Sequence, residues 1–321
     1  MALPDFFLLG APKAGTTALH AALAQHPQLY LSRVKEPKFY LCDGRPPPRS
    51  EQRGPGDAHS AREWVWKRST YESLFDPAPT GTLRGESTPF YLYDRAAHRR
   101  IHADVPNAKL LVVLRDPIDR AYSNWMHLRS DGLEPISDFA SAWAAEDHRV
   151  AQGWAPFWHY RRLGLYGEQV RDLIDRFGRD QVHVLRYRDL VETPVEALDA
   201  VSGFLGVSTG LIGGAKRANS HPYVAPSART EAIARVVRVG AALGAWAPPQ
   251  VWRQASRPLL AALQRGATRR PVLPAEVRMR LVESYREDNT LLGQLTGRSF
   301  ADWMGTTSRG QFADTMQPKA D

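Results

Sequence analysis

A lysine inside a short glycine-containing loop is the first feature of the sequence that could do chemistry. Residues Gly10-Ala-Pro-Lys-Ala-Gly-Thr-Thr17 follow an apolar run, Phe6 to Leu9, and precede a segment, Thr17 to Gln25, with apolar residues at helical spacing. A strand, a glycine loop and a helix open many nucleotide-binding α/β units. Successive backbone N–H groups and the helix N-terminus then point at an anion. We therefore expect the loop to bind a phosphate-like group, with an ordinary strand–helix turn as the alternative.

The position of Lys13 argues against the usual ATP-binding form of this loop. The Walker loop reads Gly-x-x-x-x-Gly-Lys-Ser/Thr, and its Ser or Thr holds Mg²⁺. Here Thr16 and Thr17 follow the second glycine, Gly15, and the lysine lies inside the loop. A donor without a metal-bridged triphosphate would not need the missing residues. The two threonines add hydroxyl donors, and Lys13 can reach the group under transfer.

A second candidate anion site follows the clearest buried strand that the sequence predicts, Lys109 to Arg115. Arg115 ends this strand, and Ser123 lies eight residues later, about two turns into the next predicted helix. Ligands bind at the carboxyl ends of parallel strands, and an Arg fork and a hydroxyl can converge on one phosphate. The alternative is that Arg115 forms a structural ion pair with Asp116 or Asp119.

Together, the two segments resemble the signatures of sulfotransferases that use 3′-phosphoadenylyl sulfate (PAPS). The first signature, Pro-Lys-x-Gly-Thr-Thr, holds the 5′-phosphosulfate in that family. It matches Pro12, Lys13, Ala14, Gly15, Thr16 and Thr17. The second, Arg-x-Pro…Arg…Ser, holds the 3′-phosphate and matches Arg115-Asp116-Pro117…Arg120…Ser123. The resemblance runs from about Phe6 to Pro222, and it implies PAPS as co-substrate and 3′,5′-adenosine bisphosphate (PAP) as product.

Two further segments resemble the heparan-sulfate-type branch of that family. Lys35-Glu36-Pro37-Lys38-Phe39-Tyr40 corresponds to Glu-Pro-His-Phe-Phe, and Gly85-Glu86-Ser87-Thr88-Pro89-Phe90-Tyr91 corresponds to Glu-Lys-Thr-Pro-x-Tyr. Lys38 replaces the family His and Ser87 replaces the family Lys. In that branch both residues lie by the acceptor and the transferred group, so the looser pattern of bacterial small-molecule and lipid sulfotransferases is the better comparison.

The resemblance also implies nucleotide contacts later in the chain. Gly164-Leu165-Tyr166-Gly167 resembles a Gly-x-Tyr segment whose Tyr, here Tyr166, helps to bind the nucleotide. Lys216-Arg-Ala-Asn-Ser-His-Pro222 resembles the basic loop that closes over the 3′-phosphate and adenine, with Lys216 and Arg217 as the basic pair. The alternative for this second segment is an ordinary exposed loop.

Sulfuryl transfer to a hydroxyl is an in-line displacement that needs a base for the acceptor and a cation at the leaving oxygen. Lys13 is the predicted cation. The resemblance makes Glu36 the predicted base, and a pocket lined by Phe39 and Tyr40 would raise its pKa. Glu86 is the alternative base, in which case Glu36 would orient Lys13. A histidine base, as in the cytosolic branch of the family, is a third option.

The composition fits an enzyme that binds an anionic ligand. The 321 residues are 43% hydrophobic and carry a formal charge of +8, which suits one large α/β domain or two small ones. The positive charge favours an anionic partner without choosing among a small ligand, nucleic acid and an anionic surface. Cys42 is the single cysteine, so no internal disulfide and no multi-cysteine zinc site is expected. A cytoplasmic protein without a membrane span is expected.

The alternation of strand and helix patterns predicts a P-loop-like three-layer α/β domain with a central parallel sheet. We expect a single sulfotransferase domain over 1–321, with a core at 5–222, a helical C-terminal extension at 223–304 and a disordered tail at 305–321. Residues Gly44 to Ser60 are rich in Pro, Gly and Arg, which favours a loop or mobile lid. The aromatic residues between Trp154 and Tyr160 could cover an acceptor, or could be core.

The sequence thus predicts an enzyme that moves a sulfuryl group from PAPS to a hydroxyl of a small-molecule, lipid or sugar acceptor. No metal is expected in the reaction, and nucleic acid is not an expected partner. Two rival functions are a P-loop kinase and a non-catalytic anion-binding relative.

The remaining predicted elements are strands at Gln28 to Ser32 and Val182 to Tyr187, and helices at Trp64 to Phe75, Tyr166 to Phe177, Pro194 to Leu205, Arg229 to Leu243, Pro258 to Arg265 and Pro274 to Leu292.

Overall fold

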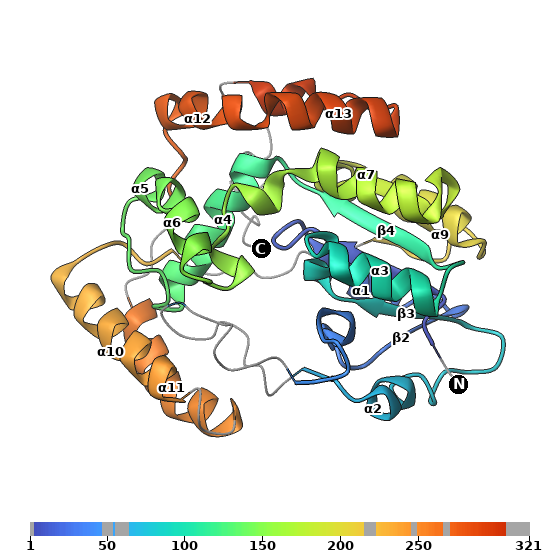
Figure 1. Cartoon of the computed structure of the whole chain (residues 1–321), viewed down its shortest axis with the longest axis horizontal. Coiled ribbons are helices and arrows are strands. Elements are labelled where there is room, and N and C mark those ends of the chain that lie inside the picture. Colours follow the sequence, from blue (N-terminus) through green and yellow to red (C-terminus); the bar gives the residue numbers. More distant parts are fainter. Residues whose placement is uncertain are drawn as a thin grey trace, which may run out of the picture.

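A five-stranded parallel sheet organises the described part of the chain (Figure 1). The computed structural model describes residues 3–46, 54, 64–214, 223–244, 249–265 and 270–305. The strands have the spatial order β2-β3-β1-β4-β5. Their bounds are β1 Phe6–Gly10, β2 Leu29–Leu31, β3 Leu83–Ser87, β4 Lys109–Leu114 and β5 Val182–Arg186. The predicted α/β fold with a central parallel sheet is confirmed.

The two central strands are the most hydrophobic, as a sheet covered on both faces requires. Every residue of β1 is buried, and β4 is buried from Leu110 to Leu114. Leu8 of β1 lies opposite Ser87 of β3 on one side and Leu111 of β4 on the other. This register places the residues that follow β1, β3 and β4 at one edge of the sheet, where the loops after the strands meet.

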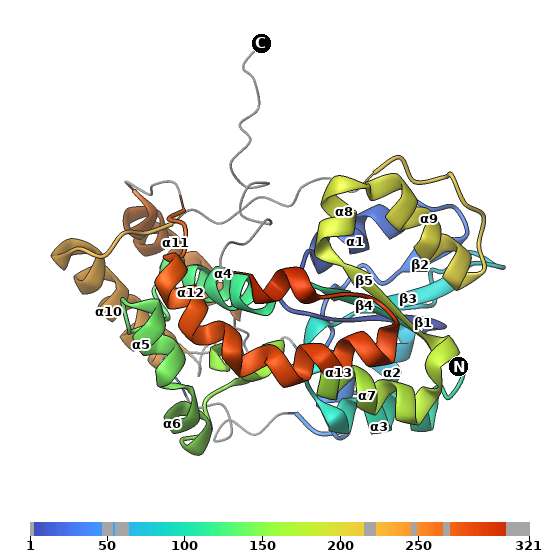
Figure 2. The same ribbon diagram turned by 90° about the horizontal axis from the view of Figure 1, so that it is seen from above.

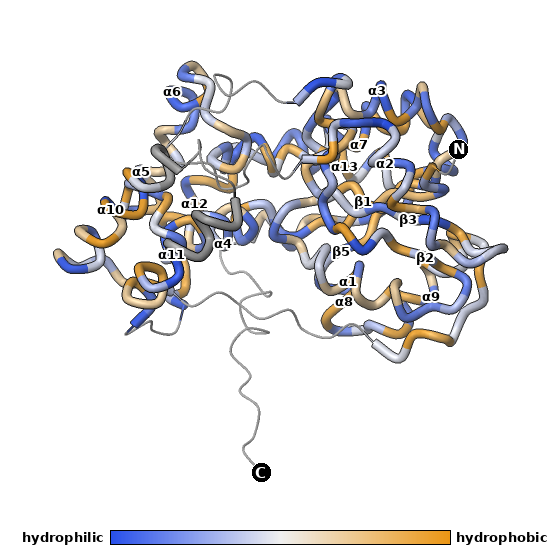
Figure 3. The backbone as a smooth tube through the Cα atoms, turned by 90° about the horizontal axis from the view of Figure 1, so that it is seen from below, coloured by the Kyte–Doolittle hydropathy of each residue, from blue (hydrophilic) through white to orange (hydrophobic). Residues whose placement is uncertain are grey.

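Helices cover both faces of the sheet (Figure 2). One face carries α1 (Thr16–Leu23), α8 (Tyr187–Glu192) and α9 (Pro194–Leu205), and the other carries α3 (Arg95–Asp104), α7 (Tyr166–Phe177) and α13 (Arg286–Thr296). The short helix α2 (Arg68–Ser73) lies beyond β2 and β3. The hydropathy colouring of Figure 3 shows hydrophobic stretches in the strands and a mixture of hydrophobic and hydrophilic residues along the helices. We call this sheet with its helices the α/β half.

A second group of helices packs around α4 (Pro117–Ser130), which leaves the sheet after β4. It contains α5 (Phe139–Ala144), α6 (Glu146–Ala151), α10 (Ala228–Gly244), α11 (Pro249–Gln264) and α12 (Ala275–Val282). We call these helices with α4 the helical half. Its own hydrophobic core includes Trp125, Phe139, Trp158 and Tyr285, all nearly inaccessible to solvent.

The C-terminal segment differs from its prediction in two places. Helix α11 begins at Pro249 and includes Pro258, so the prediction of a start at Pro258 was wrong. The predicted helix from Pro274 to Leu292 is two helices, α12 and α13, joined by a turn at Glu283–Tyr285. The turn lets the buried Tyr285 donate a hydrogen bond to the Arg161 carbonyl oxygen at 3.1 Å. Helix α13 then packs on α7, so this segment returns to the sheet.

Candidate active site

The glycine loop is fixed to the sheet and opens directly into α1. The Ala11 N–H donates to the Val113 carbonyl oxygen on β4 at 2.7 Å, and the Ala14 N–H donates to the Ala11 carbonyl oxygen at 3.1 Å. Gly15 precedes α1 with φ 88°, and a Cβ there would lie 2.7 Å from Cδ2 of Tyr187. Only glycine fits this position on both counts. Helix α1 starts at Thr16, so its N-terminal N–H groups face the loop.

The six predicted loop residues therefore lie where an anion would be bound. Pro12, Lys13 and Ala14 form the turn, Gly15 precedes the helix, and Thr16 and Thr17 begin α1. Burial, together with the charges of Arg270 and Arg115, lowers the pKa of Lys13 to about 8, and the charges of Asp131 and Glu36 oppose this shift. Lys13 thus stands at the centre of a cluster of charged groups, and a bound anion would restore its proton affinity.

Arg115 lies beside this loop. Its Nη1 donates weakly to the Lys13 carbonyl oxygen at 3.5 Å, and its guanidinium lies 5.1 Å from the ring centre of Tyr187. Asp116 and Asp119 are ion-paired with Arg278. The alternative of a structural pair between Arg115 and these carboxylates is thus disfavoured. Ser123 is buried two turns into α4, which Arg115 precedes.

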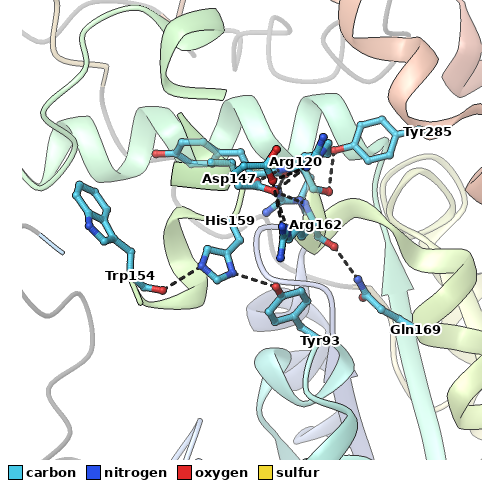
Figure 4. Close-up of polar contacts among 11 residues, drawn as sticks. Tyr93, Arg120, Asp147, Trp154, His159, Arg162, Gln169 and Tyr285 are labelled. Carbon is cyan, nitrogen blue, oxygen red and sulfur yellow. Dashed lines mark hydrogen bonds and ion pairs between the residues drawn. The ribbon is translucent and has the colours of Figure 1, made fainter. Parts of the chain in front are cut away.

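Buried donors without hydrogen-bond partners lie near Arg115. The hydroxyl of Tyr166, at the start of α7, has no partner among the described residues, and burial raises its pKa, while the charges of Arg120 and Arg115 lower it. Arg120 is fully buried and donates from Nη2 to the Tyr160 carbonyl oxygen at 2.5 Å, beside Tyr285 in Figure 4. Its Nε and Nη1 likewise have no partner within the described ranges. Because unsatisfied buried donors are costly, these groups fit a bound anion or ordered water.

The predicted base, Glu36, follows β2 and is held to the next strand. Its N–H donates to the Ser87 carbonyl oxygen at 2.9 Å, and its Oε1 accepts a 2.6 Å ion pair from Lys35. The Glu36 carboxylate is therefore ion-paired with its neighbour in sequence. It does not remove Glu36 from the site, because the Glu36 carboxylate also acts on the pKa of Lys13. About a quarter of the side chain is exposed, so an acceptor has access to it.

Glu86 lies within β3 rather than after it, and it is fully buried. It accepts hydrogen bonds from the hydroxyls of Thr88 at 2.5 Å, Tyr71 at 2.7 Å and Tyr91 at 3.2 Å. Burial raises its pKa to about 7, against the effect of these bonds. Phe39 stacks on Tyr71 with ring centres 4.1 Å apart, so the predicted aromatic pocket surrounds Glu86. An enclosed carboxylate with three hydroxyl donors is poorly placed to take a proton from an acceptor.

Three side chains near the site have no counterpart in the sequence prediction. His20 on α1 lies 2.8 Å from the Ser87 hydroxyl, through Nδ1, and burial lowers its pKa to about 4. Asp131, just after α4, and Arg270, in the segment before α12, both act electrostatically on Lys13. The sequence did single out Ser87, the hydrogen-bond partner of His20, because it replaces a lysine of the resembled pattern. Nothing in the sequence links Asp131 or Arg270 to a loop more than a hundred residues away.

The aromatic segment from Trp154 to Tyr160 is mostly core. Phe157, Trp158 and Tyr160 are buried against α4. His159 pins the segment: its Nε2 donates to the Trp154 carbonyl oxygen and its Nδ1 accepts from the Tyr93 hydroxyl, each at 3.0 Å (Figure 4). Lys216 and Arg217 lie outside the described residues, as do most of the predicted lid at Gly44 to Ser60 and the tail from residue 306.

The fold and site define a class: an α/β enzyme with a lysine in the loop before its first helix and cationic side chains after the strand β4. Residues 4–210 match the model of the Sulfotransferase family. The chain belongs to this family and is a sulfotransferase, of the class that transfers sulfuryl groups.

Known relatives agree with this assignment. A sulfotransferase structure from Alicyclobacillus acidocaldarius has a TM-score of 0.71 and 28% identity, covering 94% of this chain and 99% of that one. Human heparan sulfate glucosamine 3-O-sulfotransferase 6 is 26% identical over 92% of this chain and 73% of its own length. Mouse bifunctional heparan sulfate N-deacetylase/N-sulfotransferase 4 is 28% identical over 64% of this chain. The matched region covers 22% of the length of the mouse protein.

None of the described helices combines the length and apolarity needed to cross a bilayer. No group of three or more His, Cys, Asp or Glu side chains suited to holding a metal ion occurs within the described ranges.

Proposed function

We propose that this sulfotransferase moves a sulfuryl group from PAPS to a hydroxyl of a small-molecule, lipid or sugar acceptor and releases PAP. The observation that carries the proposal is the pairing of two separate cationic sites. One is the loop with Lys13 at the N-terminus of α1, and the other combines Arg115, Arg120 and Tyr166. A donor with a 5′-phosphosulfate and a 3′-phosphate has an anion for each site.

The first site would hold the phosphosulfate. Backbone N–H groups of the loop and of the first turn of α1, with the hydroxyls of Thr16 and Thr17, supply donors to its oxygens. Lys13 would neutralise the charge that builds on the bridging oxygen as the S–O bond breaks. A lysine with a pKa near 8 is charged at neutral pH and gains further protonation once the anion is bound.

The second site would hold the 3′-phosphate. The unpartnered N–H groups of Arg120 and the hydroxyl of Tyr166 support this assignment, because both would gain a partner, directly or through water. Arg115 and Ser123 would complete the site. We further propose that Lys216 and Arg217, in their basic loop, contact the same phosphate and the adenine.

The reaction then needs one proton transfer. The acceptor hydroxyl loses its proton to the Glu36 carboxylate while its oxygen forms a bond to sulfur, and the electron pair of the broken S–O bond stays on the phosphate of PAP. The exposure of Glu36 and its electrostatic coupling to Lys13 support this role. Glu86 would lie behind it as an enclosed carboxyl group that takes no part in the proton transfer.

Ligand-induced thermal shifts test the donor class. We expect PAP at saturating concentration to raise the melting temperature and ATP with Mg²⁺ to leave it nearly unchanged, since only a ligand of the folded state stabilises it. The shift with PAP should be lost in Lys13→Ala and Arg115→Ala. Stabilisation by ATP alone would favour the kinase alternative, and no PAP binding by the unmodified protein would refute the proposal.

A further inference from the structure

The segment that carries the proposed base has a backbone conformation that other parts of the molecule must hold. We call residues 36–40 the base segment. Glu36 and Lys38 both have φ 60°, in the left-handed region that residues with a side chain rarely adopt. Glu36 also precedes Pro37, and a residue before proline is normally extended. Such a conformation persists only where surrounding contacts fix it, so these contacts determine where the Glu36 carboxylate lies.

Two side-chain hydroxyls from the stretch after β3 accept backbone N–H groups of the base segment. The Tyr40 N–H donates to the Tyr91 hydroxyl oxygen at 3.1 Å, and the Lys38 N–H makes a longer bond, 3.4 Å, to Oγ1 of Thr88. All four residues are buried. A buried N–H that loses its acceptor is costly, because water does not reach it to take the acceptor's place. The two hydroxyls therefore fix the base segment directly after Glu36.

One carboxylate orients both hydroxyls. Oε1 of Glu86 accepts the Thr88 hydroxyl at 2.5 Å, and Oε2 of Glu86 accepts the Tyr91 hydroxyl at 3.2 Å. A hydroxyl has a single hydrogen to donate, and its lone pairs remain as acceptors. Because Thr88 and Tyr91 give their hydrogens to Glu86, their lone pairs are available to the N–H groups of Lys38 and Tyr40. Glu86 thus acts on the base segment through two hydroxyls.

A third hydroxyl bonds the same carboxylate by a different route. The Tyr71 hydroxyl donates to Oε2 of Glu86 at 2.7 Å, so Tyr71 and Tyr91 share one oxygen atom. Both tyrosines are fully buried. They differ in one respect: the Tyr40 N–H donates to the hydroxyl of Tyr91. The two tyrosines therefore separate the bonding of Glu86 itself from the fixing of the base segment.

We propose that Glu86 is a positioning residue, which orients the Thr88 and Tyr91 hydroxyls so that they hold the base segment and place the Glu36 carboxylate at the acceptor. The proposal rests on the role of Glu36 as base under the proposed function. A buried carboxylate that is bonded on both oxygens has one preferred orientation. Without it the two hydroxyls could rotate, their N–H partners would lose an acceptor, and the left-handed backbone would relax. Turnover would then fall while donor binding remained.

Tyr91→Phe and Tyr71→Phe form a matched pair that tests this inference. Each removes one buried hydroxyl from Oε2 of Glu86 and keeps the aromatic ring. Tyr91→Phe also removes the acceptor of the Tyr40 N–H, so turnover should fall about ten- to a hundredfold while PAP affinity stays unchanged. Tyr71→Phe should change neither. Calorimetry with PAP, and sulfuryl transfer from labelled PAPS to a panel of alcohols, phenols and sugars, are the measurements.

Thr88 gives a second test that does not depend on the tyrosines. Thr88→Val keeps the shape of the side chain and removes the hydroxyl, so turnover should fall at unchanged PAP affinity. Thr88→Ser keeps the hydroxyl and should retain turnover. Glu86→Gln supplies one acceptor oxygen where the carboxylate has two, so at least one of the bonded hydroxyls loses its partner. Its turnover should also fall, but less than that of Glu36→Gln.

Amide hydrogen exchange, followed by NMR without donor or acceptor, reads the contact itself. Exchange of the Tyr40 amide should rise at least about tenfold in Tyr91→Phe and stay unchanged in Tyr71→Phe. Equal exchange in these two variants, or equal turnover in both together with normal turnover of Thr88→Val, would overturn this inference and leave the proposed function standing. Absence of PAP binding by the unmodified protein, or normal turnover of Glu36→Gln, would overturn the proposed donor or base and this inference with it.

Discussion

Nη1 of Arg278 on α12 lies 3.2 Å from Oδ1 of Asp119 on α4, and the same guanidinium is ion-paired with Asp116. Arg278 is almost wholly buried, and it also donates to the Trp303 and Gly305 carbonyl oxygens at 3.0 and 2.9 Å. Asp116 in turn caps α4 by accepting from the Ile118 N–H at 3.0 Å. One guanidinium therefore joins the C-terminal segment to the turn that follows Arg115.

Replacing Arg278 with methionine should destabilise the fold by about 3–5 kcal/mol, because two buried carboxylates would lose their cation. Urea unfolding followed by tryptophan fluorescence measures this effect. Arg286→Met provides the comparison, since Arg286 is more than half exposed and pairs with Glu283 at the surface. That change should leave the free energy of unfolding nearly unchanged. Equal effects of the two changes would contradict the assigned role of Arg278.

Gly15→Ala should destabilise the protein by about 2 kcal/mol or more and abolish PAP binding. Its left-handed backbone disfavours a side chain, and the added methyl would collide with Tyr187. Gly203→Ala is the matched change, because Gly203 lies within α9 with open space around it. It should stabilise the protein by about 0.5–1 kcal/mol and leave PAP binding intact. Thermal unfolding with and without PAP measures both quantities.

Tyr166→Phe should separate binding from stability. The hydroxyl has no hydrogen-bond partner among the described residues, so its removal should leave the melting temperature without ligand unchanged or slightly higher. If the hydroxyl contacts the donor, PAP affinity should fall about five- to tenfold. Unchanged PAP affinity in the variant would show that the Tyr166 hydroxyl does not contribute to the second anion site.

Glu36→Gln should retain PAP binding within about twofold and lose two to four orders of magnitude in turnover. Labelled sulfate transfer to a panel of alcohols, phenols and sugars is the measurement, with calorimetry for PAP. Glu86→Gln is the informative comparison, since Glu86 is enclosed by three hydroxyls. Normal turnover by Glu36→Gln together with an inactive Glu86→Gln would reverse the two assignments.

The buried Glu86 should also make stability depend on pH. Its pKa is about 7 in the folded protein, against an ordinary value of 4.5. Between these pH values the folded state holds a proton that the unfolded state has released, so the free energy of unfolding falls as pH rises. The loss amounts to about 3 kcal/mol by pH 7.5. Glu86→Gln should lack this component, and denaturant unfolding of both proteins at pH 5 and pH 7.5 measures the difference.

The strand and helix patterns predicted several elements of the α/β half, while β3, α3 and α8 had no predicted bounds. β1, β4, α7 and α9 occur as expected, because continuous apolar runs and helical periodicity report burial on a sheet. The structure brings Arg115 next to the loop that carries Lys13, and the binding roles of both residues stay predictions.

The parts that could not be predicted depend on contacts between distant segments. Asp131 and Arg270 approach Lys13 only through the packing of the helical half, and single-sequence patterns carry no trace of such pairs. The aromatic pocket was assigned to Glu36 although it surrounds Glu86, because alternation along β3 does not reveal which carboxylate points inward. Pro258 was read as a helix start, yet α11 continues through it.

Tyr187 lies against both proposed anion sites, because its ring is next to Gly15 and faces the Arg115 guanidinium. One rigid ring therefore holds the loop of Lys13 and the Arg115 side chain in place relative to each other. If each site binds an anion, as we propose, the pair acts as a gauge for the ligand: two anionic groups at the matching separation occupy both sites, whereas the contiguous phosphates of ATP occupy one. Selectivity against ATP then follows from geometry rather than from any contact with the base.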